Sequence, residues 1–286
     1  MNADAHFAIG GLQVAVSGSD TLDMLLEMPG MNVFASRSDS APAIEIGLDQ
    51  PVSEVDCRWI TDYDSGDGHT RCHFGVESDG SLHYHFEGEG FVHYSPGQPG
   101  KVVMGTFHSQ AVLRYALWLA YAMPALSFHA VPVHSSVVVA HGQAVLCLGE
   151  SGTGKSTHTR LWLQHIAGSN LLNDDSPIVR VESDGVWAYG SPWSGKTPCF
   201  INRRVPVRAF VRLSQAPSNK IVSLPRLAAF GSLLPSCPPD AARLESSLDA
   251  LVDYVGRVVA QVPVYHLDCL PDADAARLCH ATLFEA

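Results

Sequence analysis

The sequence has few charged residues and no long apolar run, and both shortages narrow the possible functions. Only 16% of the 286 residues are charged, and 18 basic side chains face 29 acidic ones, which gives a net charge of −11. A general nucleic-acid binder usually carries a basic face, so we expect no nucleic-acid partner. The richest apolar stretch, residues 116–126, is shorter than the ~20 residues that span a bilayer and contains Pro124. We therefore expect no membrane association.

Cysteine pairs and a targeting segment are also lacking. The seven cysteines are odd in number and scattered, and none forms a C-x-x-C pair. This usage favours reduced thiols. The first residues have neither the basic start nor the apolar run of a signal peptide. Together these features predict a soluble protein of the cytoplasm.

What the chain does contain is a glycine-rich stretch that fits the pattern G-x-x-x-x-G-K-[ST] at every fixed position. The stretch consists of Gly149, Glu150, Ser151, Gly152, Thr153, Gly154, Lys155, Ser156 and Thr157. An apolar run of strand character precedes it, and residues 157–167 read as a helix. In that context backbone N–H groups and a helix N-terminus gather around phosphate oxygens. We expect Lys155 to reach the outer phosphates of a nucleoside triphosphate and the Ser156 hydroxyl to ligate Mg²⁺.

The organisation of the chain changes close to residue 125. Residues 1–104 are β-rich, and the spacing of apolar residues over 106–123 predicts a helix that Pro124 ends. From residue 126 onward short strands alternate with helices. We predict an α/β protein with two domains: a β-rich N-terminal domain, 1–125, that ends in a helix, and a phosphate-loop domain, 126–286.

An acidic pair lies at the end of a predicted strand, 19 and 20 residues after Lys155. Asp174 and Asp175 are spaced as the second arm of a magnesium site that a phosphate loop needs. Neighbouring residues on a strand point to opposite sides, so one carboxylate can face the metal while the other acts as a general base. The alternative is an acidic turn or helix cap.

A histidine precedes the loop by 15 residues, on the strand predicted before the phosphate-loop strand. His134 would lie beside the phosphates or the acidic pair if the two strands are neighbours. A lone histidine in a strand is more often a buried core residue.

The order of His134, the loop and Asp174-Asp175 resembles that of the HPr kinase/phosphorylase family, and the likeness covers about residues 128–215. The resemblance implies a mixed central sheet with a phosphate loop and flanking helices, shared with ATP-dependent phosphoenolpyruvate carboxykinases. It implies transfer of the ATP γ-phosphate to a serine hydroxyl with Mg²⁺. Lys155 and Ser156 would hold phosphates and metal, and Asp174 or Asp175 would serve as base or metal ligand. His134 would support the phosphates or the base.

A second segment, residues 190–196, resembles a Ser-Pro-Trp-x-Gly-Lys stretch of HPr-kinase-like serine kinases. It contains Trp193 and Lys196, and Arg203 and Arg204 follow. The basic residues are either a clamp for nucleotide phosphate and the phospho-acceptor or solvated surface charges. Trp193 either lines the acceptor pocket or packs on the core.

The chain also departs from the family. A C-terminal Gly-Arg-Asn segment that clamps HPr has no counterpart, because Gly256-Arg257 is followed by Val258. The predicted function is therefore an ATP-dependent kinase for a serine or similar hydroxyl of a peptide, small protein or small metabolite. The alternatives are an ATP-sensing module that binds a partner and a small carboxykinase-type enzyme. The family forms oligomers, so a homo-oligomer is a further expectation.

Four histidines in the β-rich part, His73, His83, His85 and His93, suggest a metal site at first sight. A two-residue turn at Asp79-Gly80 would place His83 opposite Val76 and His73 on the other face. On that register the four side chains do not converge, so we expect no zinc site.

Overall fold

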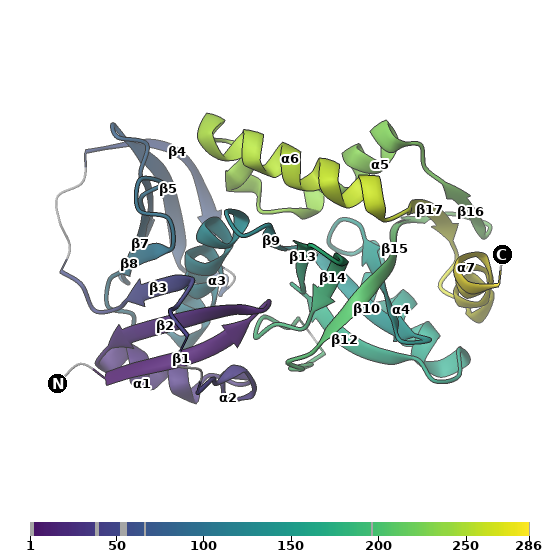
Figure 1. The fold of residues 1–286 in the computed structure, drawn as a ribbon, viewed down its shortest axis with the longest axis horizontal. Coiled ribbons are helices and arrows are strands. Elements are labelled where there is room, and N and C mark those ends of the chain that lie inside the picture. The colour runs from purple at the N-terminus through teal and green to yellow at the C-terminus, as the bar shows by residue number, and fades with distance from the viewer. Residues whose placement is uncertain (1–2, 38–39, 52–55, 66, 196, 286) are drawn as a thin grey trace. The chain divides into compact units, whose positions relative to one another are not determined.

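The computed structural model describes residues 3–37, 40–51, 56–65, 67–195 and 197–285. Its contacts divide the chain into two compact units, Met1–Phe128 and His129–Ala286 (Figure 1). Each unit combines a mixed β-sheet with α-helices, so the predicted α/β class is confirmed. No helix within the described ranges is long and apolar enough to cross a membrane.

The first unit is built on an eight-stranded sheet with the order β1-β2-β3-β8-β7-β6-β5-β4. Its strands are β1 (Ala3–Ile9), β2 (Leu12–Gly18), β3 (Ile44–Gly47), β4 (Cys57–Asp64), β5 (Arg71–Glu77), β6 (Leu82–Phe86), β7 (Phe91–Tyr94) and β8 (Lys101–Met104). Its helices are α1 (Asp20–Glu27), α2 (Met31–Phe34) and α3 (Gln110–Leu126). The sequence patterns missed β4, β8, α1 and α2.

Local sequence accounts for the clearest elements of this unit. Gly10 and Gly11, with φ of 58° and 72°, form the two-residue turn that pairs β1 with β2, as hairpins of this type require. Helix α3 begins where the Ser109 side chain accepts a hydrogen bond from the Val112 N–H. The prediction that Pro124 ends this helix is wrong, because Pro124 lies in its last turn.

The predicted register of the β5–β6 hairpin is wrong by one residue. Three residues rather than two separate the hydrogen-bonded ends Glu77 and Ser81, so His73 lies opposite His85 and His83 opposite Gly75. His83 is also opposite His93 on β7. Because strand side chains alternate, all four histidines share one face of the sheet. No three His, Cys, Asp or Glu side chains in the described part of the chain are arranged to hold a metal.

The second unit contains a nine-stranded sheet. Its strands are β9 (Ala130–Pro132), β10 (Ser135–Ala140), β11 (Gln143–Leu148), β12 (Asn170–Asp175), β13 (Ile178–Glu182), β14 (Gly185–Tyr189), β15 (Arg204–Gln215), β16 (Lys220–Ser223) and β17 (Val264–Cys269). The helices are α4 (Lys155–His165), α5 (Arg226–Leu233), α6 (Glu245–Gln261) and α7 (Ala273–Phe284), with short 3₁₀ turns η1 (Leu234–Ser236) and η2 (Pro239–Ala242). Strands β11, β15 and β17 run parallel to one another.

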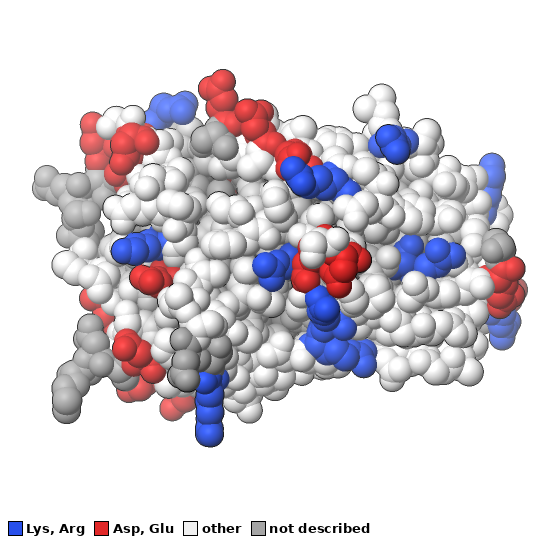
Figure 2. All heavy atoms as spheres, viewed as in Figure 1, with Lys and Arg blue, Asp and Glu red and all other residues white. Residues whose placement is uncertain are grey.

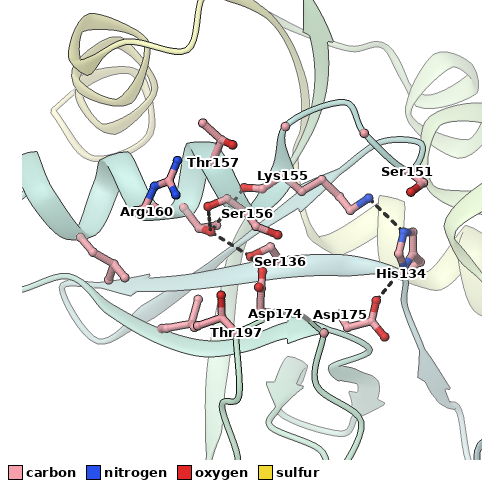
Figure 3. A pocket seen from close by; sticks show the side chains of 16 residues that line it. His134, Ser136, Ser151, Lys155, Ser156, Thr157, Arg160, Asp174, Asp175 and Thr197 are labelled. Carbon is pink, nitrogen blue, oxygen red and sulfur yellow. Dashed lines mark hydrogen bonds and ion pairs between the residues drawn. The ribbon is translucent and has the colours of Figure 1, made fainter. Parts of the chain in front are cut away.

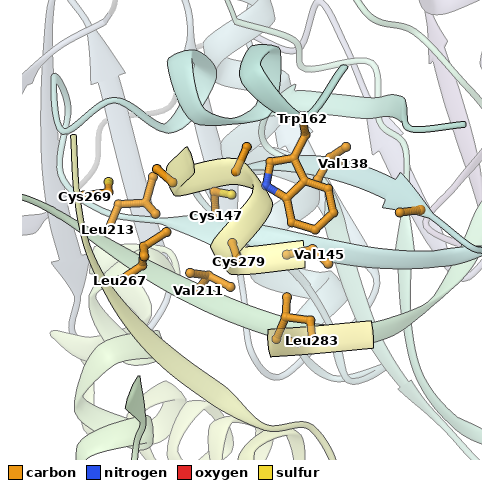
Figure 4. Packing of buried hydrophobic residues seen from close by; sticks show 14 residues of the cluster. Val138, Val145, Cys147, Trp162, Val211, Leu213, Leu267, Cys269, Cys279 and Leu283 are labelled. Carbon is orange, nitrogen blue, oxygen red and sulfur yellow. The ribbon is translucent and has the colours of Figure 1, made fainter. Parts of the chain in front are cut away.

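Helices α4 and α7 cover one face of this sheet. Trp162 of α4 and Cys279 of α7 are fully buried against Val145 and Val211 of the parallel strands (Figure 4). The β11 strand is apolar from Ala144 onward because it is covered on both faces. The strand that leads into the glycine-rich loop is therefore packed in the core.

Charge on the surface is mixed. On the face drawn in Figure 2, Lys and Arg side chains are interspersed with Asp and Glu rather than gathered in one continuous patch. The seven cysteines form no disulfide bond.

Buried His83 leads to a prediction about stability at acid pH. Burial, together with His93 and His85, lowers its pKa from 6.5 to about 4. The unfolded chain therefore takes up the proton first, and stability is lost as pH falls through 6.5 toward 4. Between about pH 7.5 and 5, the wild type should lose roughly 2 kcal/mol more unfolding free energy than His83→Phe, which has no ring nitrogen to protonate. Urea unfolding of the full chain at both pH values measures this.

The exposed His69 provides the control for this comparison. His69→Gln should follow the wild-type pH dependence. If the unfolding free energies of His83→Phe and the wild type fall equally between the two pH values, His83 does not cause the loss of stability at acid pH.

Candidate functional site

The glycine-rich loop connects β11 to α4, as the sequence predicted. Three of its glycines have positive φ: Gly149 at 148°, Gly152 at 83° and Gly154 at 104°. These conformations are strained for residues with a side chain. At Gly149 a Cβ atom would also lie 2.5 Å from the Thr153 hydroxyl. The loop therefore has a shape that only glycine at these positions allows.

The Lys155 ammonium group closes over this loop. Its Nζ donates to the backbone oxygens of Gly149 at 2.8 Å and Glu150 at 3.2 Å. The side chain is partly buried, and this burial lowers its pKa below 10.5, although Asp175 and Glu150 act in the opposite direction. Lys155 thus presents a positive charge to the space above the loop while it is held by the loop itself.

His134 links Lys155 to the acidic pair. The prediction placed His134 on a strand, but the residue lies in the gap between β9 and β10. Lys155 Nζ is 2.9 Å from its Nε2, and Asp175 Oδ1 is 3.3 Å from its Nδ1 (Figure 3). Because an ammonium group can only donate, Nε2 accepts and a neutral ring carries its proton on Nδ1, toward Asp175.

The two neighbouring carboxylates have different surroundings. Strand β12 pairs with β10 so that Asp174 is opposite Ser136 and Asp175 opposite Ser135. Asp174 is buried, and its Oδ1 accepts a 2.7 Å hydrogen bond from the Ser136 hydroxyl. The Asp175 side chain is 40% exposed and lies beside His134. The two carboxylates therefore differ, because Asp174 is buried and Asp175 is half-exposed beside His134.

One oxygen of Asp174 has no partner among the described residues. Its Oδ2 atom is inaccessible to solvent, and none of the residues that the structure describes donates a hydrogen bond to it. A buried carboxylate oxygen without a donor is costly and calls for a cation or a donor that completes the site. Hard oxygen ligands such as carboxylates and hydroxyls are those that Mg²⁺ prefers, and Ser156 lines the same cavity. The residues present therefore fit a magnesium ion.

These groups line one cavity of about 530 Å³. Seven lining residues are not among the predicted site residues: Ser136, Thr159, Arg160, Leu163, Leu171, Gly195 and Thr197. Helical spacing from Lys155 and Ser156 would have indicated Thr159 and Arg160, which follow them by four residues. Ser136 contacts Thr159 at 2.9 Å as well as Asp174, and nothing in the local sequence signals that contact.

Two residues of the segment after Gly190, Gly195 and Thr197, line the cavity. Gly195 approaches the acidic pair so closely that a Cβ atom would lie 2.5 Å from the Asp174 backbone oxygen. Trp193 is buried, which favours its packing role over that of a pocket wall. Its backbone oxygen accepts a hydrogen bond from the Asn173 amide at 3.2 Å. Lys196 lies outside the described residues.

The two predicted arginines are not brought to the cavity. Arg204 pairs with Glu182 at 2.7 Å, and its guanidinium lies 4.1 Å from the centre of the Trp187 ring. Arg203 is exposed, and neither residue lines the cavity. The interpretation of Arg204 as a phosphate clamp is not supported, because nearby β13 and β14 already provide its partners.

Comparison with known proteins adds little to this picture. No family model matches the chain, and no curated protein does. Among solved structures, an HPr(Ser) kinase/phosphatase from Coxiella burnetii is similar over 53% of this chain and 92% of its own, at 13% sequence identity. The TM-score of 0.31 is too low for this similarity to carry an argument.

The bond between Ser136 and Asp174 can be tested by its effect on stability. Ser136→Ala removes the donor and leaves both oxygens of a buried carboxylate without a described partner. We expect the unfolding free energy to fall by about 1–3 kcal/mol. In an Asp174→Ala background the same substitution should cost much less, because the carboxylate is gone. Equal costs in the two backgrounds, measured by urea unfolding, would contradict the assignment.

Proposed function

We propose that this chain is an ATP-dependent phosphotransferase. It would transfer the γ-phosphate of ATP to a serine or similar hydroxyl of a peptide, a small protein or a small metabolite. The observation that carries the proposal is that one cavity gathers the loop lysine, His134 and both carboxylates of the acidic pair. A loop that only binds a nucleotide needs no histidine-linked carboxylate at its open side.

The glycine-rich loop and Lys155 would bind the phosphates. The first N–H groups of α4 have no partner within the helix and carry its partial positive charge, so they suit phosphate oxygens. The loop oxygens of Gly149 and Glu150 hold Lys155 in place. From there its ammonium group would balance the charge of the β- and γ-phosphates.

Mg²⁺ would be held by the Ser156 hydroxyl and Asp174. We assign Asp174 to the metal because its Oδ2 is buried and lacks a described donor. When bound, the ion neutralises negative charge on the β- and γ-phosphate oxygens. The Ser136 hydroxyl fixes the other oxygen of Asp174, so the carboxylate is oriented before the ion arrives.

Asp175 would be the general base. Its half-exposed carboxylate is reachable by an acceptor, and the His134 ring holds it by one oxygen. The acceptor hydroxyl oxygen would bond to the γ-phosphorus while the bond to the β,γ-bridging oxygen breaks and ADP leaves. The hydroxyl proton would pass to Asp175. His134 would act as a positioning residue between this base and Lys155.

The two carboxylates should respond differently to substitution. Asp174→Asn should lower the transfer rate in a way that high Mg²⁺ partly restores, because a weakened ligand is compensated by mass action. Asp175→Asn should lower the rate by about 10²–10⁴-fold at any Mg²⁺ concentration, because the base is lost. Transfer from γ-labelled ATP to a panel of peptides and free serine measures both.

This assay also separates the competing functions. Near wild-type rates in both variants would show that the pair is structural. ATP binding without transfer to any acceptor would favour a sensing module instead. Oxaloacetate turnover would favour the carboxykinase-type alternative.

The lowered pKa of Lys155 predicts a pH effect on nucleotide binding. As pH rises, Lys155 loses its charge earlier than an ordinary lysine with a pKa of 10.5, so ATP affinity should already fall as pH rises toward 10.5. Lys155→Arg keeps its charge throughout this range, and its affinity should change less with pH. Calorimetric titration at several pH values checks this, and identical pH profiles would contradict it.

A further inference from the structure

A second cavity lies on the other side of the glycine-rich loop. It has a volume of about 610 Å³ and is formed where the parallel strands β11, β15 and β17 end. Residues after β15 and β17, among them Ala216, Pro217, Leu270 and Pro271, form its walls together with Leu161 of α4. Ligands of α/β proteins bind outside the carboxyl ends of such strands. The cavity is therefore at the edge of the sheet where a ligand is expected.

The two cavities differ in chemistry. The first contains Lys155, Arg160 and both carboxylates, whereas no described residue lining the second is Lys, Arg, Asp or Glu. Its walls combine aliphatic and proline side chains with a few uncharged polar ones, Thr153, Thr157, His158 and Gln215, and Leu270 is 37% exposed. Such a site suits a flat apolar group with a few polar edges and does not suit a phosphate.

The loop connects the two cavities. Gly152, Gly154 and Thr157 line both of them. A ligand with phosphates in the first cavity can therefore extend along the loop into the second without leaving the protein surface. The two adjoining cavities therefore suit a molecule that is highly charged at one end and largely apolar at the other.

One buried ring nitrogen in the second cavity, Nδ1 of His158, has no hydrogen-bond partner among the described residues. His158 is 3% exposed and lines the cavity, and the Trp162 indole N–H donates to its Nε2 at 3.1 Å. A neutral ring must then carry its proton on Nδ1, which has no hydrogen-bond partner among the described residues. Burial lowers the pKa of His158 to about 4, so the ring stays neutral near pH 7. A buried N–H donor is therefore left for a ligand acceptor.

We propose that this second cavity is the nucleoside subsite, which holds the base and ribose of the nucleotide whose phosphates occupy the first cavity. This inference rests on the proposed function. Leu161, Pro217 and Leu270 contact the base, and His158 Nδ1 donates to a ring nitrogen or a ribose oxygen. Thr157 lies at the crossing point, where the first phosphate joins the ribose.

The test uses substitutions that add bulk to the second cavity or remove apolar contact from it, and it compares the binding of two ligands. Calorimetry with Mg²⁺ measures the affinities for ATP and for inorganic triphosphate, which lacks the nucleoside. Ala216→Trp should weaken ATP binding at least tenfold and leave triphosphate binding within about twofold. Leu270→Ala removes apolar contact without adding bulk and should weaken ATP binding severalfold. Ala228→Trp and Leu227→Ala, at exposed positions of α5 outside both cavities, are the matched controls.

The outcomes separate the subsite from the function on which it rests. Unchanged ATP affinity in both Ala216→Trp and Leu270→Ala, with triphosphate still bound, overturns the nucleoside subsite and leaves the phosphate site intact. Failure of the wild type to bind either ATP or triphosphate overturns the proposed function and the subsite with it. A selective loss of ATP affinity supports both.

Discussion

The antiparallel pairing of β10 with β12 is the constraint on which the candidate site depends. Strand β10 also pairs with β11, which leads into the glycine-rich loop. A single central strand therefore fixes the acidic pair relative to the loop. The register sets Ser136 opposite Asp174, so the inward carboxylate finds a hydroxyl donor. A slip of one residue would turn Asp174 outward and Asp175 into the core. The chemistry of the site thus depends on the register as much as on the residues themselves.

Short-range patterns made part of this site predictable. The glycine-rich loop lies between a strand and a helix, as predicted. This arrangement was predictable because the glycine spacing and the apolar strand lie within about twenty residues of sequence. The contact between Ser136 and Asp174 joins residues 38 apart, and no local pattern encodes such a pairing. The hairpin register was wrong because a turn of three residues rather than two lies between Glu77 and Ser81. For Arg204, charge alone could not show that Glu182 and Trp187 would be its neighbours.

The loop also separates two environments that a nucleotide would need together. Charged and polar groups gather on the Asp174 side, and aliphatic and proline side chains gather on the Leu161 side. The Lys155 ammonium group already has the loop oxygens and His134 as hydrogen-bond partners. Phosphates would then have to compete with existing hydrogen bonds rather than meet an unpaired ammonium group. Each hydrogen bond from Lys155 to a phosphate would replace one to a loop oxygen or to His134. The net gain in binding free energy is therefore smaller than the energy of the new bond alone.

The backbone of His134 is held from a distant part of the chain. Its N–H donates to the Ser236 oxygen at 2.7 Å, in the short turn η1 that follows α5. Ser236 is itself buried and lines neither cavity. A change in the α5–η1 segment can therefore move the ring between Lys155 and Asp175 without altering any residue that lines the cavity. Substitutions in this remote support would change the position of the His134 ring in the cavity while the sequence of the glycine-rich loop stays the same.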